Sequence, residues 1–226
     1  MQIRALVFDA YGTLFNVHSV MSTCEALFPG KGSALSQLWR TKQLEYSWLR
    51  SLMGRYVDFN QVTREGLQYA CKSLNLTYSE AVLAQLEAAY RALSLFDDTR
   101  PALEQLRRQQ PAIKLAVLSN GAPAMLHAVV TYNKLDAMLD AVLSVDEVGI
   151  FKPDPRVYQL ACDRLGVVPD AIGFVSSNGW DAAGAKAFGF NTFWINRGSA
   201  PVEELGVTPD RTLSSLAELP ALVAMQ

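Results

Sequence analysis

The chain has 226 residues and a formal net charge of −2, from 20 Lys and Arg against 22 Asp and Glu, with a pI near 5.7. This balance gives no basic field that would attract nucleic acid or an anionic membrane surface. Half of the residues are hydrophobic, which is enough for a sizeable core. No apolar run reaches the ~20 residues needed to cross a bilayer. We expect a soluble globular protein without a nucleic-acid or membrane partner.

The cysteines and the first residues indicate the cellular compartment in which the protein is expected. Cys24, Cys71 and Cys162 have no metal-type spacing and cannot all pair, so a disulfide scaffold is disfavoured. Small buried apolar side chains are the simpler interpretation of all three. The first residues also lack a basic segment followed by an apolar stretch and a cleavage site. We therefore expect a cytoplasmic protein.

A first strand is predicted at Ala5–Phe8, where a hydrophobic run ends in Asp9 and then breaks at Gly12 and Thr13. A carboxylate at the end of a buried strand is unfavourable unless cations and hydrogen-bond donors hold it. Partners for Asp9 are therefore expected from other parts of the chain.

From about Val17 to Leu95 the pattern predicts several amphipathic helices and no convincing strand. In the first of them Gly54 is a plausible stop, and Ser79 is a plausible N-cap of the last. The apolar positions with helical spacing are Leu35, Leu38, Trp39, Tyr46, Leu49, Leu52 and Met53, then Leu67, Ala70 and Leu74, then Val82, Leu83, Leu86, Tyr90 and Leu93.

From Thr99 onward helices and strands alternate, which is typical of a parallel sheet covered on both faces. Strands are predicted at 114–118, 141–144, 172–175 and 192–195, and helices near 102–108, 123–132, 155–165 and 180–188. The first strand has no partner before the helical block and so joins this later sheet. The predicted fold is α/β: a Rossmann-like parallel sheet core (1–15 and 98–226) with an inserted helical cap (16–97).

Polar residues follow four of the predicted strands. Ligands of an open parallel sheet bind outside the carboxyl ends of its strands. Each residue alone could be explained by turn chemistry, but together they indicate a site. The residues are Asp9, then Ser119, Asn120 and Gly121, then Lys152, then Ser176, Ser177, Asn178 and Asp181.

The segments VFDAYGTLF, LAVLSNG, the lysine of IFKPDP and FVSSNGWDAAGAK resemble the haloacid dehalogenase superfamily in order and spacing. Most members are phosphatases, which need a second Asp two residues after the nucleophile and an acidic pair in the last motif to bind magnesium. Here Tyr11 takes the first position, and a phenol with a pKa of about 10 does not replace a carboxylic acid. Ser176, Ser177 and Asn178 stand where phosphatases place acids.

The chain resembles the L-2-haloacid dehalogenases more closely, through DAYGTLF, WR in the cap, QLEYSWLRSLMGRY, SNG, FKPDPRVY and SSNGWDA. The resemblance implies that Asp9 displaces halide from an (S)-2-haloacid with inversion, and that water then hydrolyses the aspartyl ester to an (R)-2-hydroxyacid. It implies no metal or cofactor, a 2-haloalkanoic acid and a halide ion as ligands, and a homodimer built through the cap.

The resemblance assigns catalytic roles to nine residues. Asp9 is the nucleophile, Lys152 its cationic partner, Thr13 its hydrogen-bond donor, and Ser119 holds the substrate carboxylate. Ser176, Asn178 and Asp181 position the hydrolytic water, with Asp181 as base; Tyr158 orients Lys152 or Asp9; and Arg40 receives the halide. Five of them could also have a purely structural role: a solvated loop for Lys152, a turn cap for Thr13, a helix N-cap for Asp181, packing for Tyr158 and a surface position for Arg40.

The halide and substrate pocket implied by the resemblance comprises Arg40, Ser119 and Asn120 with the apolar residues Tyr11, Leu44, Phe59 and Trp180. The apolar members could equally be core. Thr41 follows Arg40 where some relatives have Gln, which changes one polar group of the implied pocket and leaves the substrate preference open. His18 and His127 match no catalytic position, so structural or solvent-facing roles are expected for both.

Two other functions are compatible with the fold. One is a magnesium-dependent phosphate-ester or phosphonate hydrolase, which the missing acids disfavour. The other is a non-enzymatic interaction partner, since a fold alone does not fix a function. The dimer also has an alternative, because Trp48, Leu49 and Leu52 could be cap core.

Overall fold

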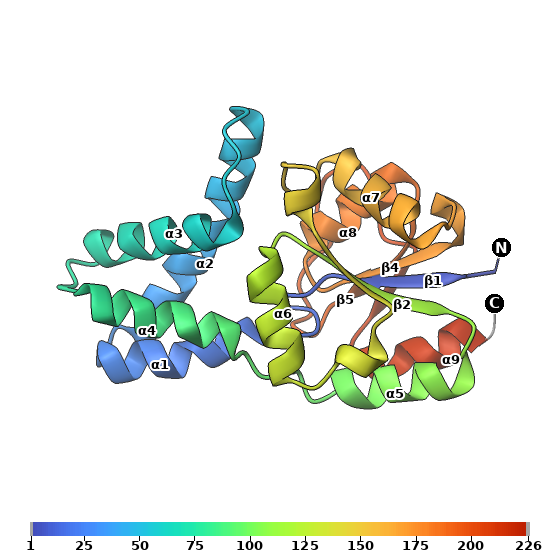
Figure 1. The fold of residues 1–226 in the computed structure, drawn as a ribbon, viewed down its shortest axis with the longest axis horizontal. Coiled ribbons are helices and arrows are strands. Elements are labelled where there is room, and N and C mark those ends of the chain that lie inside the picture. The colour runs from blue at the N-terminus through green and yellow to red at the C-terminus, as the bar shows by residue number, and fades with distance from the viewer. Residues whose placement is uncertain (1, 225–226) are drawn as a thin grey trace.

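The computed structural model describes residues 2–224 and contains, within them, one parallel sheet of six strands in the order β3-β2-β1-β4-β5-β6 (Figure 1). β1 lies in the middle, between β2 and β4. All four of its residues are buried, as expected of a strand covered on both faces. The strands are β1 Ala5–Phe8, β2 Lys114–Ser119, β3 Ala141–Ser144, β4 Ile172–Ser176, β5 Asn191–Ile195 and β6 Arg211–Leu213.

Helices cover both faces of this sheet. In Figure 1, α7 and α8 lie above it, and α5 and α9 lie below. The α-helices of this part are α5 Thr99–Gln109, α6 Pro123–Tyr132, α7 Pro155–Leu165, α8 Gly179–Phe188 and α9 Leu219–Ala224. Short 3-10 helices are η1 Val17–Ser19, η2 Asp136–Met138, η3 Val145–Glu147, η4 Pro169–Ala171 and η5 Leu216–Glu218.

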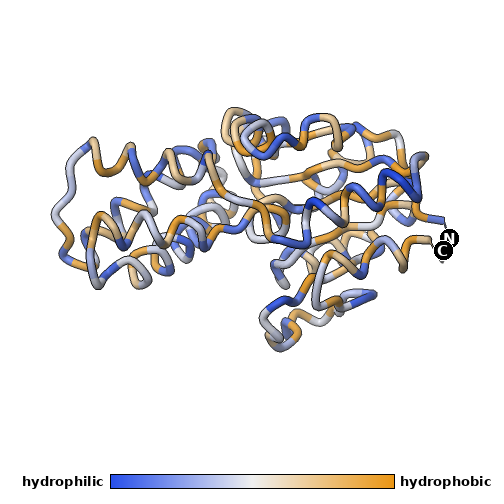
Figure 2. The backbone as a smooth tube through the Cα atoms, turned by 90° about the horizontal axis from the view of Figure 1, so that it is seen from below, coloured by the Kyte–Doolittle hydropathy of each residue, from blue (hydrophilic) through white to orange (hydrophobic). Residues whose placement is uncertain are grey.

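A block of four helices stands beside the sheet, between β1 and α5 in the sequence (Figure 1). Hydrophobic and hydrophilic segments alternate along its helices, which are therefore amphipathic (Figure 2). The Ser79 side chain accepts from the Val82 N–H and caps the last helix, as expected. The helices are α1 Val20–Leu27, α2 Gly32–Leu52, α3 Phe59–Ser73 and α4 Glu80–Arg91.

The chain enters the helical block through 14–16 and leaves it through 94–98, and these two connecting segments lie side by side. Phe15 and Leu95 form an antiparallel bridge. The Asn16 N–H donates to the Ser94 carbonyl at 2.8 Å, and the Phe96 N–H donates to the Leu14 carbonyl at 3.1 Å. We call 94–98 the exit hinge. We call 10–16, the segment that follows Asp9, the nucleophile turn. Its backbone is hydrogen-bonded to the exit hinge, so a movement of one segment would displace the other.

The predicted α/β fold, a parallel sheet with an inserted helical block, is confirmed. The predicted strands match β1 to β5 to within one residue at each end. Among the α-helices and strands, α1, α9 and β6 were not predicted, because six to eight helical residues or three strand residues are too short to establish a period. The short 3-10 helices were not predicted either. The division into core and cap at 16–97 stays a prediction, and its outermost residues 1 and 225–226 lie outside the described part.

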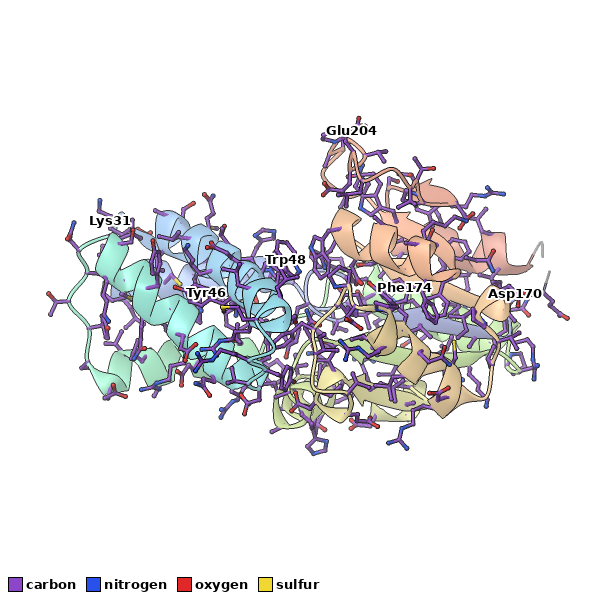
Figure 3. The ribbon with its side chains drawn as sticks, turned by 90° about the horizontal axis from the view of Figure 1, so that it is seen from above. Lys31, Tyr46, Trp48, Asp170, Phe174 and Glu204 are labelled. Carbon is purple, nitrogen blue, oxygen red and sulfur yellow. The ribbon has the colours of Figure 1, made fainter. Side chains whose placement is uncertain are left out.

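The helical block packs on the sheet part near the carboxyl ends of the strands. The Trp48 ring on α2 meets the Trp180 ring on α8 edge-on, with centroids 5.3 Å apart. Figure 3 shows Trp48 where the two parts approach each other, and Lys31 at the far end of the block. The same edge of the sheet carries Asp9. No helix in residues 2–224 is both long and apolar enough to span a membrane.

Candidate active site

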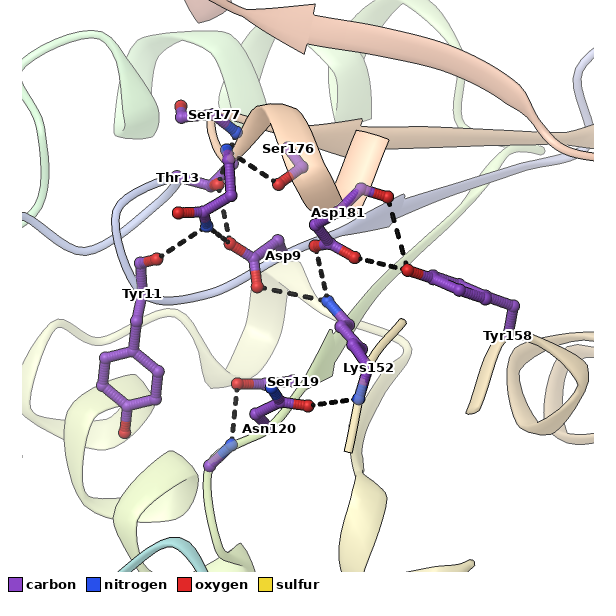
Figure 4. Close-up of polar contacts among 12 residues, drawn as sticks. Asp9, Tyr11, Thr13, Ser119, Asn120, Lys152, Tyr158, Ser176, Ser177 and Asp181 are labelled. Atoms are coloured by element: carbon purple, nitrogen blue, oxygen red, sulfur yellow. Dashed lines mark hydrogen bonds and ion pairs between the residues drawn. The ribbon is translucent and has the colours of Figure 1, made fainter. Parts of the chain in front are cut away.

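Asp9 lies directly after β1 and is 6% exposed. Its Oδ1 accepts from Lys152 Nζ at 3.2 Å. Its Oδ2 accepts from Thr13 Oγ1 at 2.9 Å and from Asn178 Nδ2 at 2.8 Å (Figure 4). The carboxylate is therefore held by a cation on one oxygen and by two neutral donors on the other.

A tight turn brings Thr13 back onto Asp9. Gly12 has φ +90, a conformation that L residues other than glycine rarely adopt, and its N–H donates to the Phe15 carbonyl at 2.8 Å. Thr13 Oγ1 also accepts from the Ser177 N–H at 2.8 Å. Thr13 thus makes the expected contact with Asp9, and in place of a local turn cap it accepts from the turn after β4.

Lys152 is 1% exposed, so it is not a solvated loop residue. Its Nζ lies 2.9 Å from Asp181 Oδ2 as well as 3.2 Å from Asp9 Oδ1. Burial alone would lower the pKa of Lys152, but the charges of Asp181 and Asp9 outweigh it and raise this pKa above its ordinary value. The backbone N–H of Lys152 donates to Asn120 Oδ1 at 2.9 Å. The ammonium group is therefore charged and fixed between two carboxylates.

Asp181 is fully buried in the first turn of α8. Asn178 occupies the N-cap position, so the alternative of Asp181 as N-cap is wrong. Burial raises the pKa of Asp181 to about 6, against the opposing charge of Lys152. A carboxyl group with this pKa can exchange a proton near neutral pH.

Tyr158 contacts a different partner from the one expected. Its hydroxyl donates to Asp181 Oδ1 at 2.8 Å, and not to Lys152 or Asp9. The reason is the packing of α7 on α8. A Cβ at Gly184 would lie 2.6 Å from the Tyr158 hydroxyl oxygen, so only glycine at this position lets the ring approach Asp181. Tyr158 therefore reaches Asp9 only through Asp181 and Lys152.

The serines of the site accept hydrogen bonds from their own turns. Ser119 Oγ accepts from the Gly121 N–H, and Ser176 Oγ accepts from the Asn178 N–H, both at 3.1 Å. Both side chains are buried. These contacts fit the turn chemistry that either serine alone would suggest, and they leave each hydroxyl proton available to a ligand.

The helical block contributes Arg40 and Phe59 to this region. Arg40 lies on α2, is half-buried, and has no carboxylate within 4.0 Å among residues 2–224. Burial raises the pKa of Tyr11, and the nearby charges of Arg40 and Asp9 act on it in opposite directions. The Tyr11 ring stacks with Phe59 at 6.3 Å, and its buried hydroxyl has no hydrogen-bond partner among the described residues. Within residues 2–224, a cation without a carboxylate partner and a hydroxyl without a hydrogen-bond partner therefore lie within electrostatic range of each other.

Leu44 and Trp180 are half-buried, the first one turn after Arg40 on α2 and the second at the start of α8. A hollow of about 780 Å³ opens between the helical block and the sheet part, and its lining includes Trp48, Phe151, Lys152 and Trp180. Lys152 thus forms part of the wall of a space large enough for a small organic ligand.

Other residues singled out in the sequence lie away from Asp9. His18 and His127 are exposed, which agrees with a solvent-facing role. Thr41 is exposed too, and its hydroxyl donates to the Gln37 carbonyl within α2, so the expected change of a pocket polar group is not seen. Residues 2–224 contain no group of three or more His, Cys, Asp or Glu side chains that could hold a metal ion.

Sequence reasoning missed Arg197 and its partner Asp98. Arg197 follows β5, and its guanidinium donates to Ser177 Oγ at 2.9 Å and to the Thr13 carbonyl at 3.1 Å. The signal was available, because Arg197 follows the fifth predicted strand and so lies at the same edge of the sheet as Asp9.

Comparisons with known proteins identify the family of the chain. The model of the haloacid dehalogenase-like hydrolase family matches residues 3–189. The chain is 50% identical over 214 residues to an (S)-2-haloacid dehalogenase of Pseudomonas sp. (strain YL), covering 95% of this chain and 91% of that protein. It is 43% identical over 224 residues to haloacetate dehalogenase H-2 of Moraxella sp. (strain B), covering 99% of each.

A solved structure of a relative is similar to this chain over nearly its whole length. The L-2-haloacid dehalogenase from Xanthobacter autotrophicus with chloropropionic acid covalently bound has a TM-score of 0.92 and 44% identity, and the match covers 98% of each chain. The resemblance drawn from the sequence motifs is confirmed. The chain belongs to the haloacid dehalogenase-like hydrolases, and within them to the (S)-2-haloacid dehalogenase family.

Proposed function

We propose that the protein hydrolyses (S)-2-haloacids to (R)-2-hydroxyacids through an ester on Asp9. The observation that carries this function is the buried Asp9 carboxylate, with Lys152 on one oxygen, together with Arg40, whose charge acts on Tyr11 and which has no carboxylate partner among residues 2–224. A halide leaves as an anion without needing a proton. A nucleophile and a free cation therefore suffice for its displacement.

In the first step Asp9 Oδ1 attacks C2 of the substrate. The C2–halogen bond breaks, the halide takes the electron pair, and C2 inverts. Among the described residues Oδ1 accepts from Lys152 alone, whereas Oδ2 accepts from two donors, so Oδ1 is the oxygen more accessible to the substrate. Arg40 and the Tyr11 hydroxyl would stabilise the departing halide, with Asn120 as a further donor, while Leu44, Phe59 and Trp180 exclude water. Ser119 and the N–H groups after β2 would bind the substrate carboxylate.

In the second step water attacks Cγ of Asp9. Oδ2 is now the ester carbonyl oxygen, and Thr13 and Asn178 are placed to donate to the oxyanion that forms on it. Asp181 would accept the proton of the water, which Ser176 and Asn178 position, and Tyr158 holds Asp181. When the tetrahedral intermediate collapses, the Cγ–Oδ1 bond breaks. Lys152 Nζ, which contacts both Oδ1 and Asp181, would give a proton to the alkoxide oxygen and take back the proton that Asp181 accepted. The hydroxyacid leaves with Oδ1, and the second proton of the water is released to solvent as the Asp9 carboxylate re-forms. The water oxygen stays in Asp9.

The magnesium-dependent phosphate-ester or phosphonate hydrolase is the competing function. Tyr11 cannot protonate an alkoxide leaving group as a carboxylic acid would, because burial raises its pKa further above the ordinary phenol value. In addition, the Asn178 amide donates to Asp9 where a metal-binding acid would be needed. Both observations favour halide as the leaving group.

The test is halide release from (S)- and (R)-2-chloropropionate and from chloroacetate, with EDTA present. We expect release from the (S) substrate, and loss of steady-state release by about 10³-fold or more in Asp9→Asn, which lacks the nucleophile. The relative from Moraxella makes chloroacetate the natural second substrate to compare. Arg164→Met, an exposed Arg ion-paired with Glu147, serves as control.

The outcome separates the two functions. Magnesium-dependent release of phosphate from an ester, without halide release from any of the three acids, would contradict the dehalogenase and establish the alternative. Equal release from both enantiomers would contradict the in-line attack on one face of C2.

The proposal extends to the organisation of the protein. We propose that 16–97 act as a cap over a core of 1–15 and 98–226, that two copies form a homodimer through the cap, and that the enzyme works in the cytoplasm. Cys24, Cys71 and Cys162 are unpaired and buried, which is compatible with a reducing compartment. Exposed apolar residues on the cap, including Leu49 and Met53, support the dimer.

A further inference from the structure

Arg197 connects three segments that are distant in the sequence. Its guanidinium pairs with Asp98, with Nη2 at 2.8 Å from Oδ1 and Nε at 3.2 Å from Oδ2. It also lies 4.0 Å from the centroid of the Phe96 ring. Its other N–H groups donate to Thr13 and Ser177, as described above. One side chain therefore contacts the exit hinge, the nucleophile turn and the turn after β4.

Asp98 fixes this guanidinium in place. Burial would raise the pKa of Asp98, but hydrogen bonds from Arg197, Ser215 and the Leu216 N–H outweigh it and lower this pKa. The carboxylate is therefore charged throughout the neutral range. Asp98 accepts from both Nε and Nη2 of the planar guanidinium, so neither side chain can move without the other.

Arg197 reaches Asp9 only through other groups. Thr13 presents its carbonyl to Arg197 and its hydroxyl to Asp9 Oδ2. The Ser177 hydroxyl accepts from Arg197, and the Ser177 N–H donates to Thr13 Oγ1. The next residue, Asn178, is the second donor to Oδ2. Both donors to Oδ2 are thus anchored to Arg197, whereas the donor to Oδ1, Lys152, is anchored to Asp181 and Asn120.

We propose that Arg197 is a positioning residue for the hydrolytic half of the reaction, linking the exit hinge to the two donors that stabilise the oxyanion on Asp9. This proposal rests on the proposed function. Ester formation uses Oδ1 and the halide site, which do not depend on Arg197. Ester hydrolysis needs charge stabilised on Oδ2, so a loosened Thr13 and Asn178 slow this step selectively.

The experiment compares Arg197→Lys and Arg197→Met with the Arg164→Met control. Halide release from (S)-2-chloropropionate gives kcat and KM, and mass spectrometry of acid-quenched samples during turnover measures the fraction of enzyme carrying the ester. The lysine ammonium can still pair with Asp98, but it lacks the several N–H groups of the guanidinium that reach Thr13 and Ser177 together. We expect kcat to fall by about tenfold or more in both variants, with a raised ester fraction and a KM that does not increase.

Ser177→Ala removes one of the Arg197 contacts and leaves the ion pair intact. It should raise the ester fraction less than Arg197→Lys does. If Arg197→Met does not fold, Arg197→Lys and Ser177→Ala decide the question, with thermal unfolding to show that both are native.

Two results would overturn the proposal. One is a kcat and an ester fraction in folded Arg197→Lys equal to those of Arg164→Met. The other is a fall in kcat without accumulated ester, which would show a general structural role. Failure of the wild-type protein to release halide would instead refute the proposed function, so the two failures are distinguishable.

Discussion

Asp9, Lys152 and Asp181 place two carboxylates around one ammonium group in the protein interior. All three side chains are buried, with Lys152 Nζ within 3.2 Å of an oxygen from each acid. Burial is the main cause of the raised pKa of Asp181, and the charge of Asp9 adds to it because one cation cannot balance two anions. The surplus carboxylate is the one that can act as a base.

Tyr158→Phe tests this arrangement through the pH profile. Asp181 must be ionised to accept a proton, so kcat should fall as the pH drops through about 6. The Tyr158 hydroxyl donates to the ionised form of Asp181 and lowers its pKa, against the larger effect of burial. Removing it should therefore move the acid limb to higher pH. The measurement is halide release between pH 4 and 9 at saturating substrate.

Tyr132→Phe, at an exposed tyrosine on α6, is the matched control and should keep the wild-type limb. An unchanged limb in Tyr158→Phe would show that Asp181 is not the titrating base.

Sequence reasoning could identify the individual polar residues because each follows a strand of one sheet. It could not identify which of these side chains are hydrogen-bonded to each other. Which oxygen of Asp9 receives Thr13, or which acid receives Tyr158, depends on side-chain packing such as the contact at Gly184. Arg197 was missed for a related reason: an Arg after a strand is ordinarily a surface residue, and its contacts come from segments about 20, 100 and 180 residues away.

At the level of elements, the turn between β1 and the helical block positions the nucleophile. Its shape depends on Gly12 at φ +90. The sequence predicted the strand before it well, because a continuous apolar run that ends in a carboxylate is typical of a buried strand leading into a site. It predicted the elements at the end of the chain poorly, since β6 is a three-residue edge strand with two exposed residues.

Gly12→Ala should lower the free energy of unfolding by about 1–2 kcal/mol, because an L residue is strained at this φ. A Cβ at Gly12 would lie 3.8 Å from Asn178 Nδ2, which is ordinary contact, so the effect comes from the backbone and not from a clash. Relaxation of the turn should displace Thr13 and lower kcat as well. Urea unfolding and halide release measure the two effects.

Gly206→Ala is the control for this variant. Gly206 has φ +75 and nothing within 4 Å of an added Cβ, so it should lose similar stability without losing activity. Equal activity in the two variants would contradict the role assigned to the turn.

At the level of the whole molecule, the helical block is held against the sheet part at the far end of α2 as well as at the hinge. Tyr56 donates to Asp146, and the Phe151 N–H donates to Ser51 Oγ at 3.1 Å. The Trp48 and Trp180 rings pack edge-on beside these contacts, next to the hollow that Lys152 lines. Asp9 is 6% exposed in this conformation, so the first step would be shielded from water.

The opposite side of the helical block carries the surface proposed for the dimer. A hollow of about 600 Å³ there is lined by Tyr46, Leu49, Met53 and Tyr69 among others. Leu49 is 43% exposed and Met53 is 61% exposed, so neither is buried in the core of the helical block, and both are open to a partner beside the charged residues Arg50, Arg55, Glu65 and Lys72.

Leu49→Arg should weaken the dimer by about tenfold or more, because it places a desolvated charge in the interface beside Arg50. Sedimentation velocity over a range of concentrations measures the dissociation constant. Val168→Arg adds the same charge at an apolar residue of the sheet part that is 56% exposed, so it should leave the dimer intact. Because Leu49 does not contact Asp9 or Lys152, a monomeric Leu49→Arg that still releases halide would show that each copy carries a complete site. A wild-type protein that sediments as a monomer at all concentrations would contradict the dimer and leave this apolar side without an assigned partner.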